Sequence, residues 1–320
     1  VERLMDTYLG IDTSCYTTSL CLVDETYDIA ADERIILTVP KGGRGLSQSN
    51  MVYQHTRNLP VLFERAAAVL KTRQVRAIAV TDQPRRRDDS YMPAFLAGLG
   101  YARALSAVLQ VPLYRLSHQE NHLLAVLRSL GKIEKEPFYG IHLSGGTTEL
   151  VRAVADDKGL DITRIGGTSD ISAGQFIDRM GVAMNLPFPA GVHVDKMAQS
   201  FSGTLKGASV FFKDGEVSFS GPESQGQRFL KEGDADIPRL CRWTLATVWR
   251  GLHRLLDYAV SDGMTHLVAA GGVMSNAYLR QELGTYCQRK HIRLDLAEDG
   301  FSADNASGAA FWAALQEGKK

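Results

Sequence analysis

The sequence predicts an α/β protein built from two similar halves, and three observations carry this prediction. Strand-like and helix-like segments alternate along the chain. A short segment that begins at Gly10 is repeated in a similar form from Gly140. A chain of 320 residues with 44% hydrophobic and 22% charged content can also bury one large or two ordinary cores.

The repeated segments read GIDTSCYTTSL and GIHLSGGTTEL, and they align without a gap. Each has a short apolar run, a turn of small residues and a second alternating run, which predicts a tight β-hairpin. A chance likeness of two unrelated hairpins is the alternative. Such turns expose backbone N–H groups, so the turns at Ser14 and Ser144 would hold a polyphosphate from both sides if they faced each other.

The first half continues with strand and helix patterns in alternation. An apolar run with β-branched residues predicts a buried strand, and a longer segment with small residues has helical spacing. A second strand then leads into a helix that starts near His118. In order, these segments are 75–82, 95–110 and 112–117.

The second half repeats this alternation after a long insertion. Residues 203–236 are polar and rich in glycine, which predicts loops and a short hairpin. A long helix pattern follows, and then strand, helix, strand and helix patterns complete the chain. These segments are 239–260, 265–272, 276–291, 292–297 and 305–317.

The charge balance and the cysteine content limit which ligands and which cellular compartments we expect for this protein. Lysine plus arginine equals aspartate plus glutamate at 36 each, so nucleic acid would have to bind a local patch. The cysteines Cys15, Cys21, Cys241 and Cys287 form no CxxC motif. Four cysteines in a chain of this size do not make a disulfide scaffold, which favours a reducing, cytoplasmic setting. No signal-peptide pattern and no apolar window of membrane-spanning length is present, so we expect neither secretion nor a membrane.

The stretch LSHQENHLLA places His118 and His122 four residues apart on a predicted helix. Two imidazoles at this spacing share one face and can reach one metal ion, although core packing or solvent exposure is the more ordinary explanation. A metalloprotease HExxH motif is excluded because Glu120 occupies the third position and would point away from the metal. A third ligand must come from elsewhere, and the candidates are His142 and Asp304.

The segment AAGGVMSNAYLR is a second candidate site. A predicted strand ends in Gly271 and Gly272, whose small size lets a ligand approach the backbone. Ser275 or Asn276 can cap the following helix, whose N-terminus attracts anions. An ordinary strand–turn–helix connection is the alternative.

Acidic residues and glycines gather in a third segment, between Gly166 and Ala198. Asp170 and Asp178 flank a helix start, and the turn PFPAG ends at Gly191 with Asp195 one helical turn beyond. Acids at a helix start are usually caps. Their density beside a predicted nucleotide site also favours contacts with sugar hydroxyls.

Taken together and in this order, these motifs resemble the family of tRNA threonylcarbamoyladenosine synthases, the TsaD group formerly called glycoproteases. The resemblance spans nearly the whole chain. It pairs GIDTSCYTTSL with GIETSCDET, SHQENHLLA with HxxxH, LSGGTTEL with SGGHTQL, GGTSDISAGQFIDRMG with GETxDDAAGEAFDK, PFPAG with YPGG, AAGGVMSN with AGGVAAN, and SADNASG with TDNAAM.

The resemblance implies a fold of the actin, sugar kinase and Hsp70 type (ASKHA), with two RNase H-like domains around a nucleotide cleft. The internal repeat agrees with such a duplication. We expect an N-terminal domain over 1–136, with the C-terminal helix 305–320 packing back on it, and a C-terminal domain with inserted loops over 137–304.

The resemblance also implies a ligand set. His118, His122 and Asp304 would bind one divalent metal, iron or zinc, with His142 as a fourth ligand at a position where some relatives have tyrosine. An adenine nucleotide or acyl-adenylate would be the second ligand, and no residue is assigned a catalytic role. The expected nucleotide contacts are Ser14, Ser144, Gly145, Gly146, Thr147, Asp178, Gly191, Asp195, Gly271, Gly272 and Asn276.

Two departures from the family pattern indicate a divergent paralogue. Tyr16 and Thr17 replace an acidic pair, and DQPRRRDDSYMPAF replaces a glycine-rich GPGL segment. The basic run of Arg85, Arg86 and Arg87 is typical of a solvated loop.

The implied function is transfer of a threonylcarbamoyl group from its adenylate to N6 of the adenosine beside the tRNA anticodon. One alternative is a nucleotide-binding paralogue that has lost transfer, and another is a metallopeptidase. The implied partners are tRNA and either small proteins of the same modification pathway or a second copy of the chain.

Overall fold

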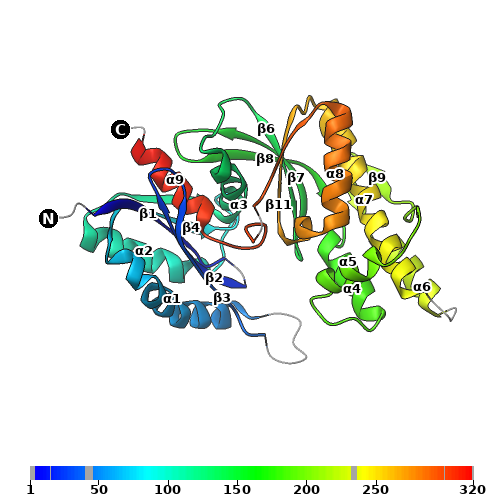
Figure 1. The fold of residues 1–320 in the computed structure, drawn as a ribbon, viewed down its shortest axis with the longest axis horizontal. Helices are drawn as coiled ribbons and strands as arrows, with labels where there is room; N and C mark the ends of the chain where they lie inside the picture. Colours follow the sequence, from blue (N-terminus) through cyan, green and yellow to red (C-terminus); the bar gives the residue numbers. More distant parts are fainter. Residues whose placement is uncertain (1–3, 15, 40–45, 232–235, 299, 319–320) are drawn as a thin grey trace. The chain divides into compact units, whose positions relative to one another are not determined.

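The computed structural model describes residues 4–14, 16–39, 46–231, 236–298 and 300–318, which form two compact units (Figure 1). The first unit contains 1–136, 154–162 and 304–320, and the second contains 137–153 and 163–303. Asp304 and the hairpin tip at 154–162 therefore belong to the first unit, whereas the sequence-based division placed both in the second. Asp304 belongs to the first unit because it lies three residues before a helix, Ser307–Gly318, that packs on the first sheet.

The sheet of the first unit has the strand order β3-β2-β1-β4-β5. Its first three strands form an antiparallel meander, and β4 and β5 continue parallel to β1. The first hairpin predicted from the repeat, β1 with β2, is present. The strands are β1 Met5–Asp12, β2 Thr17–Asp24, β3 Ile29–Ile36, β4 Arg73–Gln83 and β5 Leu113–Ser117.

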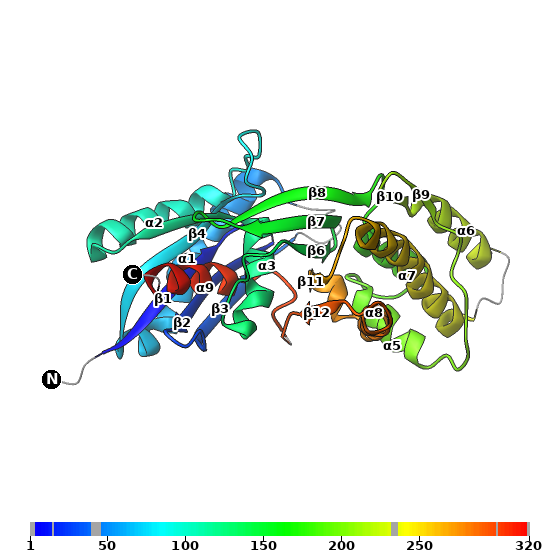
Figure 2. The same cartoon turned by 90° about the horizontal axis from the view of Figure 1, so that it is seen from above.

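Helices cover both faces of this sheet, as Figure 2 shows. Strand residues alternate between faces, so Leu9 and Ile11 pack into the core formed with α1 and α2. Gly10 faces the opposite side, where a Cβ atom would lie 2.2 Å from the carbonyl oxygen of Ala306 beside α9. The helices are α1 Gln48–Leu70, α2 Phe95–Leu109, α3 His118–Leu127, the short η1 Arg128–Leu130 and α9 Ser307–Gly318.

The sheet of the second unit repeats this order and extends it. Strand β6 pairs antiparallel with β7 and parallel with β11, and β12 continues parallel to β11. The order β12-β11-β6-β7-β8 therefore matches β5-β4-β1-β2-β3 of the first unit, and β10 and β9 are added at the far edge. The strands are β6 Phe138–Leu143, β7 Thr148–Ala155, β8 Leu160–Thr168, β9 Phe211–Lys213, β10 Glu216–Ser218, β11 His266–Ala270 and β12 Arg293–Leu296.

The core of the second unit lies between this sheet and its helices. Helix α7 contributes a broad buried face, and its N-terminus is capped by Asp236, whose side chain accepts a hydrogen bond from Arg239 N. Among the described residues, no helix combines the length and apolar character needed to cross a membrane. The helices are α4 Ala173–Ala183, α5 Gly191–Gln199, α6 Ser220–Lys231, α7 Ile237–Ser261, the short η2 Gly272–Ser275 and α8 Ala277–Lys290.

Helix α6 corrects the sequence-based expectation for 203–236. The predicted short hairpin is present as β9 and β10, but a twelve-residue helix follows it where loops were expected. The carboxylate of Asp170 accepts hydrogen bonds from the amides of Phe219 and Ser220, which stabilises the start of the helix. Gly226 packs closely against Met180 and Trp243. The long-range contacts therefore stabilise a helix that its polar, glycine-containing sequence does not indicate.

Candidate functional site

The histidine pair lies at the start of α3, directly after β5. Ser117 caps this helix: its Oγ accepts a hydrogen bond from Glu120 N at 3.2 Å, and Glu120 Oε2 accepts one from Ser117 N at 2.7 Å. This capping box turns Glu120 back toward the N-terminus, away from His118 and His122. The predicted orientation of Glu120 is confirmed.

Asp304 is placed by a close contact between α3 and α9. A Cβ atom on Gly308 would lie 2.1 Å from the carbonyl oxygen of Asn121, so only glycine fits at this crossing. The Asn121 side chain donates to the carbonyl of Asn305 at 2.6 Å and accepts from the amide of Ala309 at 2.8 Å. These contacts hold the segment that carries Asp304 against the histidine helix.

His118, His122 and Asp304 converge on one point in the first unit. The Nε2 atoms of the two histidines lie 3.0 Å apart. Asp304 Oδ1 lies 3.6 Å from His118 Nε2 and 3.3 Å from His122 Nε2. Each residue offers one ligand atom, and all three atoms lie within 4.8 Å of one another. Two imidazoles and one carboxylate facing a common point are a donor set that fits a divalent transition metal.

A second carboxylate, Asp12, contacts this cluster from behind. Asp12 is fully buried, and its Oδ1 lies 3.3 Å from His118 Nδ1. Burial lowers the pKa of His118, but the carboxylates of Asp12 and Asp304 raise it by more, so the pKa lies above its ordinary value. Burial likewise raises the pKa of Asp304, while the two histidines hold it well below its ordinary value. Both pKa shifts reflect the attraction between the imidazoles and the carboxylates of this site.

His142 lies in the second unit, on β6, opposite Glu149 of β7. It is buried, and it is not one of the three residues that converge in the first unit. Its role as a fourth metal ligand stays a prediction.

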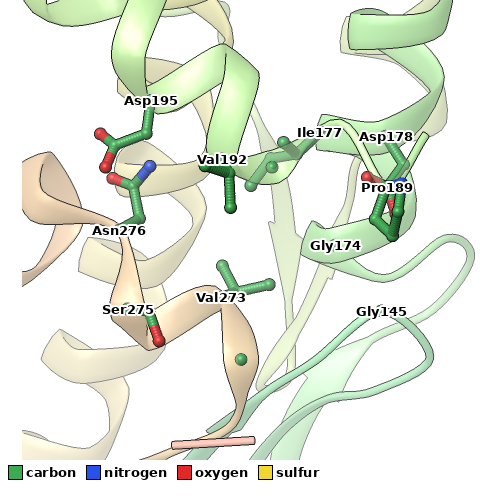
Figure 3. Close-up of a pocket in the computed structure, with 12 residues that line it drawn as sticks. Gly145, Gly174, Ile177, Asp178, Pro189, Val192, Asp195, Val273, Ser275 and Asn276 are labelled. Carbon is green, nitrogen blue, oxygen red and sulfur yellow. The ribbon is translucent and has the colours of Figure 1, made fainter. Parts of the chain in front are cut away.

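A cavity of about 380 Å³ lies in the second unit (Figure 3). It brings together α4, α5, the turn after β11 and the loop between β6 and β7. In Figure 3, Asp195 and Asn276 lie at one end and Asp178 and Pro189 at the other. The lining residues are Gly145, Gly174, Ile177, Asp178, Pro189, Gly191, Val192, Asp195, Gly272, Val273, Ser275 and Asn276.

Two carboxylates of this cavity have different environments. Asp178 Oδ1 accepts a hydrogen bond from the amide of Ala190 at 2.7 Å, ahead of α5. Burial raises the pKa of Asp178, and hydrogen bonds from the amides of Ala190 and Gly191 oppose that rise. Asp195 Oδ2 accepts from the amide of Ala277 at 3.1 Å, whereas its buried Oδ1 has no hydrogen-bond partner among the described residues. Within the described part of the chain, Asp195 Oδ1 is therefore an unsatisfied hydrogen-bond acceptor beside the cavity.

The glycine pair after β11 has two separate roles. Gly271 has φ of +96°, and a Cβ atom there would lie 2.2 Å from the carbonyl oxygen of Leu143, so this position packs the strand ends together. Gly272 has open space around its Cα and lines the cavity. Asn276 caps α8 by accepting from Leu279 N at 3.0 Å, as predicted, and it also lines the cavity.

The predicted phosphate turns use much of their hydrogen-bonding capacity internally. In the second hairpin, the amides of Gly146 and Thr147 donate to Ser144 Oγ at 3.3 and 3.0 Å. Only Gly145 of this loop lines the cavity. In the first hairpin, Ser14 is fully buried and donates to Asp12 Oδ2 at 2.9 Å. The neighbouring Cys15 lies outside the described residues.

The arginine run is not uniformly solvated. Arg86 forms a two-pronged ion pair with Asp156, at 2.7 and 3.0 Å, and its Nε lies 3.9 Å from Glu120. Arg87 makes an exposed pair with Asp89. The segment therefore ties the tip of the β7–β8 hairpin to the start of the histidine helix.

Sequence reasoning missed two groups of residues around these sites. One group is the apolar lining of the cavity, Ile177, Val192 and Val273, which lies within or beside the quoted motifs but was not expected to contact a ligand. Asp12 stands inside the first repeated segment, at the end of a strand, and that position was the available signal.

Comparisons with known proteins identify the family. The family described as "TsaD: tRNA N6-adenosine threonylcarbamoyltransferase" matches residues 40–311. The protein named tRNA N6-adenosine threonylcarbamoyltransferase from Bdellovibrio bacteriovorus is 30% identical over 337 residues, which cover 98% of this chain and 93% of that one. The protein of the same name from Neorickettsia sennetsu is 29% identical over 323 residues, covering 96% and 92%.

Solved structures with low sequence identity show the fold. HypF from T. kodakarensis superposes with a TM-score of 0.64 at 14% identity, over 99% of this chain and 48% of HypF. A ROK family glucokinase from Streptomyces griseus, in complex with glucose and AMPPNP, superposes with a TM-score of 0.52 at 12% identity, over 97% and 98%. The expected fold class of actin, sugar kinase and Hsp70 type is confirmed. The chain belongs to the TsaD family of tRNA N6-adenosine threonylcarbamoyltransferases.

Proposed function

We propose that this chain transfers a threonylcarbamoyl group from its adenylate to N6 of the adenosine beside the tRNA anticodon. The observation that carries the proposal is the convergence of His118, His122 and Asp304 in a member of this family. The exocyclic amine of adenosine is a weak nucleophile. The protein must therefore bind the acyl donor firmly and orient this amine toward it.

His118, His122 and Asp304 would hold one divalent metal, iron or zinc. Two nitrogen ligands and one carboxylate suit these metals better than magnesium, which prefers oxygen and water. When bound, the metal would act as a Lewis acid toward the donor. Three protein ligands leave a coordination position for substrate. His142 stays a proposed further ligand.

The cavity of the second unit would hold the nucleotide part of the donor. Asp195 Oδ1 would accept a hydrogen bond from a sugar hydroxyl, since this buried oxygen has no partner among the described residues. Ile177, Val192 and Val273 would provide the apolar contacts that such cavities offer. Asp178 would add a second acceptor, and Gly145, Gly191 and Gly272 let the ligand approach the backbone.

The other residues predicted to contact the nucleotide would act indirectly or only after a rearrangement. Gly146 and Thr147 would have to release Ser144 Oγ before their amides bound a phosphate. Gly271 would act by shaping the turn, and Ser14 by holding Asp12.

We extend the proposal to the setting of the reaction. A tRNA substrate would fit the cytoplasm, and the free, buried state of the described cysteines Cys21, Cys241 and Cys287 would fit a reducing compartment. The partners would be small proteins of the same modification pathway or a second copy of the chain.

No observation favours either alternative function. A peptidase of the HExxH type needs a glutamate beside the metal as general base, and Glu120 instead hydrogen-bonds to Ser117 and Leu160. For the second alternative, a paralogue without transfer activity, the described residues show no loss at the metal site, because all three candidate ligands are present and converge.

A cell depleted of its own family member provides the test. We expect the wild-type gene, supplied with the partner genes of its own source, to restore the modified adenosine in tRNA, measured by mass spectrometry of nucleosides. The His122→Ala gene should restore none. Failure of the wild-type gene despite normal expression would contradict the proposal.

A further inference from the structure

Three parallel strands of the first unit end at one edge of the sheet. Ile11 of β1 lies opposite Val80 of β4, so Asp12 and Thr81 follow side by side. Thr81 in turn lies opposite Leu116 of β5, two residues before His118. The carboxyl ends of neighbouring parallel strands form ligand sites in α/β folds, and here they bring an aspartate to the back of a histidine.

Three side chains contact the Asp12 carboxylate at this end of the sheet. Its Oδ1 accepts from Thr81 Oγ1 and lies 3.3 Å from His118 Nδ1. Its Oδ2 accepts from Ser14 Oγ at 2.9 Å. Asp12, Ser14 and Thr81 are all fully buried. A buried carboxylate is costly unless it is hydrogen-bonded, and the two hydroxyl groups and the His118 ring together meet this requirement.

We propose that Asp12 is a positioning residue that fixes the ring of His118 for metal binding. By accepting a hydrogen bond from Nδ1, Asp12 keeps the proton on that nitrogen and leaves the Nε2 lone pair directed at the point shared with His122 and Asp304. The hydroxyl groups of Thr81 and Ser14 donate hydrogen bonds to the Asp12 carboxylate and so fix its orientation. This inference rests on the metal triad of the proposed function.

The contact between the two histidines is compatible with this tautomer. His118 Nε2 lies 3.0 Å from His122 Nε2, so one of the two nitrogens accepts in any neutral pair. A proton on His118 Nδ1 makes His118 Nε2 the acceptor. Ligating histidines commonly donate their other ring N–H to a carboxylate, which sets ring orientation and basicity.

Glu120 provides a matched control on the same helix. It is also a buried carboxylate, but it accepts hydrogen bonds from Ser117 and from Leu160 N at 2.8 Å. Its removal disturbs the start of α3 without removing a hydrogen bond to His118. A merely structural role for Asp12 would make Asp12→Asn and Glu120→Gln behave alike.

Zinc binding and proton NMR of the zinc-loaded full chain test the proposal. We expect zinc on Nε2 of His118, with a visible, hydrogen-bonded Nδ1 proton. Asp12→Asn should shift or lose this signal and weaken zinc binding by about 10- to 100-fold, the range for carboxylates behind metal-bound histidines. Glu120→Gln should leave the Nδ1 proton signal in place. If Asp12→Asn does not fold, Thr81→Val, which loses one hydroxyl donor, should still move the Nδ1 signal.

The outcomes separate this proposal from the metal site itself. If the wild type binds zinc and Asp12→Asn keeps the same zinc affinity and the same Nδ1 signal, the role of Asp12 is overturned and the metal site stands. The same result in Thr81→Val has this meaning where only that variant folds. Coordination of zinc through Nδ1 of His118 would overturn the role of Asp12 as well. Wild-type protein that binds no zinc and no iron at this cluster would overturn both the metal site and the role of Asp12.

Discussion

The Nε2 atoms of His118 and His122 face each other at 3.0 Å, because residues one helical turn apart share a helix face. Two imidazole nitrogens at this distance, beside the Asp304 carboxylate, create a site that a cation would stabilise. We therefore expect His118→Ala and His122→Ala to lose bound metal. Elemental analysis of protein purified without a chelator or a histidine tag measures this. His253→Ala, which removes a more exposed histidine on α7, should keep the metal, and equal content in all four proteins would contradict the site.

Asp195 should determine nucleotide affinity in the second unit. Asn at this position can still accept the hydrogen bond from Ala277, but it places a neutral amide where Oδ1 now lies. We expect Asp195→Asn to weaken nucleotide binding by roughly 1 to 3 kcal/mol, the cost of leaving a buried polar partner unsatisfied. Isothermal titration with AMP and ATP tests this. An unchanged affinity in a folded variant would reduce Asp195 to a helix-capping residue.

Asp170 should stabilise α6 in a pH-dependent way. Burial raises its pKa, but hydrogen bonds from Ser218, Ser220 and the amide of Phe219 outweigh burial and hold the pKa below its ordinary value. Because the folded pKa is depressed, this stabilisation is present above the ordinary aspartate pKa and is lost as the pH falls through the folded value. Asp170→Asn should cost about 1 kcal/mol near neutral pH, as loss of a cap does.

Thermal unfolding at several pH values checks the prediction for Asp170. The difference in stability between wild type and Asp170→Asn should shrink as the solution is acidified. A difference that is constant with pH would mean that charge on Asp170 contributes nothing.

Gly308 should be irreplaceable because α3 and α9 cross at this position. An added Cβ atom would lie 2.1 Å from the Asn121 carbonyl oxygen, which must then move together with the segment that carries Asp304. We expect Gly308→Ala to destabilise the first unit by about 1 to 3 kcal/mol, as overpacking does. Gly100 of α2 has open space around it, so Gly100→Ala should instead stabilise by up to about 1 kcal/mol. Chemical denaturation compares the two, and equal effects would refute the packing argument.

Local patterns predicted most of the elements that form the sites. The hairpins, the strands β4, β5, β11 and β12, and the helices α2, α3, α8 and α9 follow from apolar periodicity, which local sequence displays directly. Helix α1 was not among the predicted elements, because Pro60 within it breaks the helical signal. Helix α6 was not predicted for a different reason, since the carboxylate that caps it, Asp170, is remote in sequence.

The site could be predicted as a set of residues but not as a set of contacts. The spacing of His118 and His122 indicates a shared face, whereas the approach of Asp304 depends on how α9 packs on α3. Likewise, Asp12 reaches His118 through the register of three strands. The commitment of Gly146 and Thr147 to Ser144 arises from turn geometry that composition does not display.

The most direct test of the central claim is transfer in a purified system. The metal-loaded chain is mixed with threonylcarbamoyl-adenylate and an unmodified tRNA transcript, with and without the partner proteins of its own source, and tRNA nucleosides are measured by mass spectrometry. We predict threonylcarbamoyl on N6 of the adenosine beside the anticodon with the wild-type chain, and none with His118→Ala or His122→Ala. Absence of the modified nucleoside with the metal-loaded wild-type chain and its partners, or equal yields from all three proteins, would contradict the account.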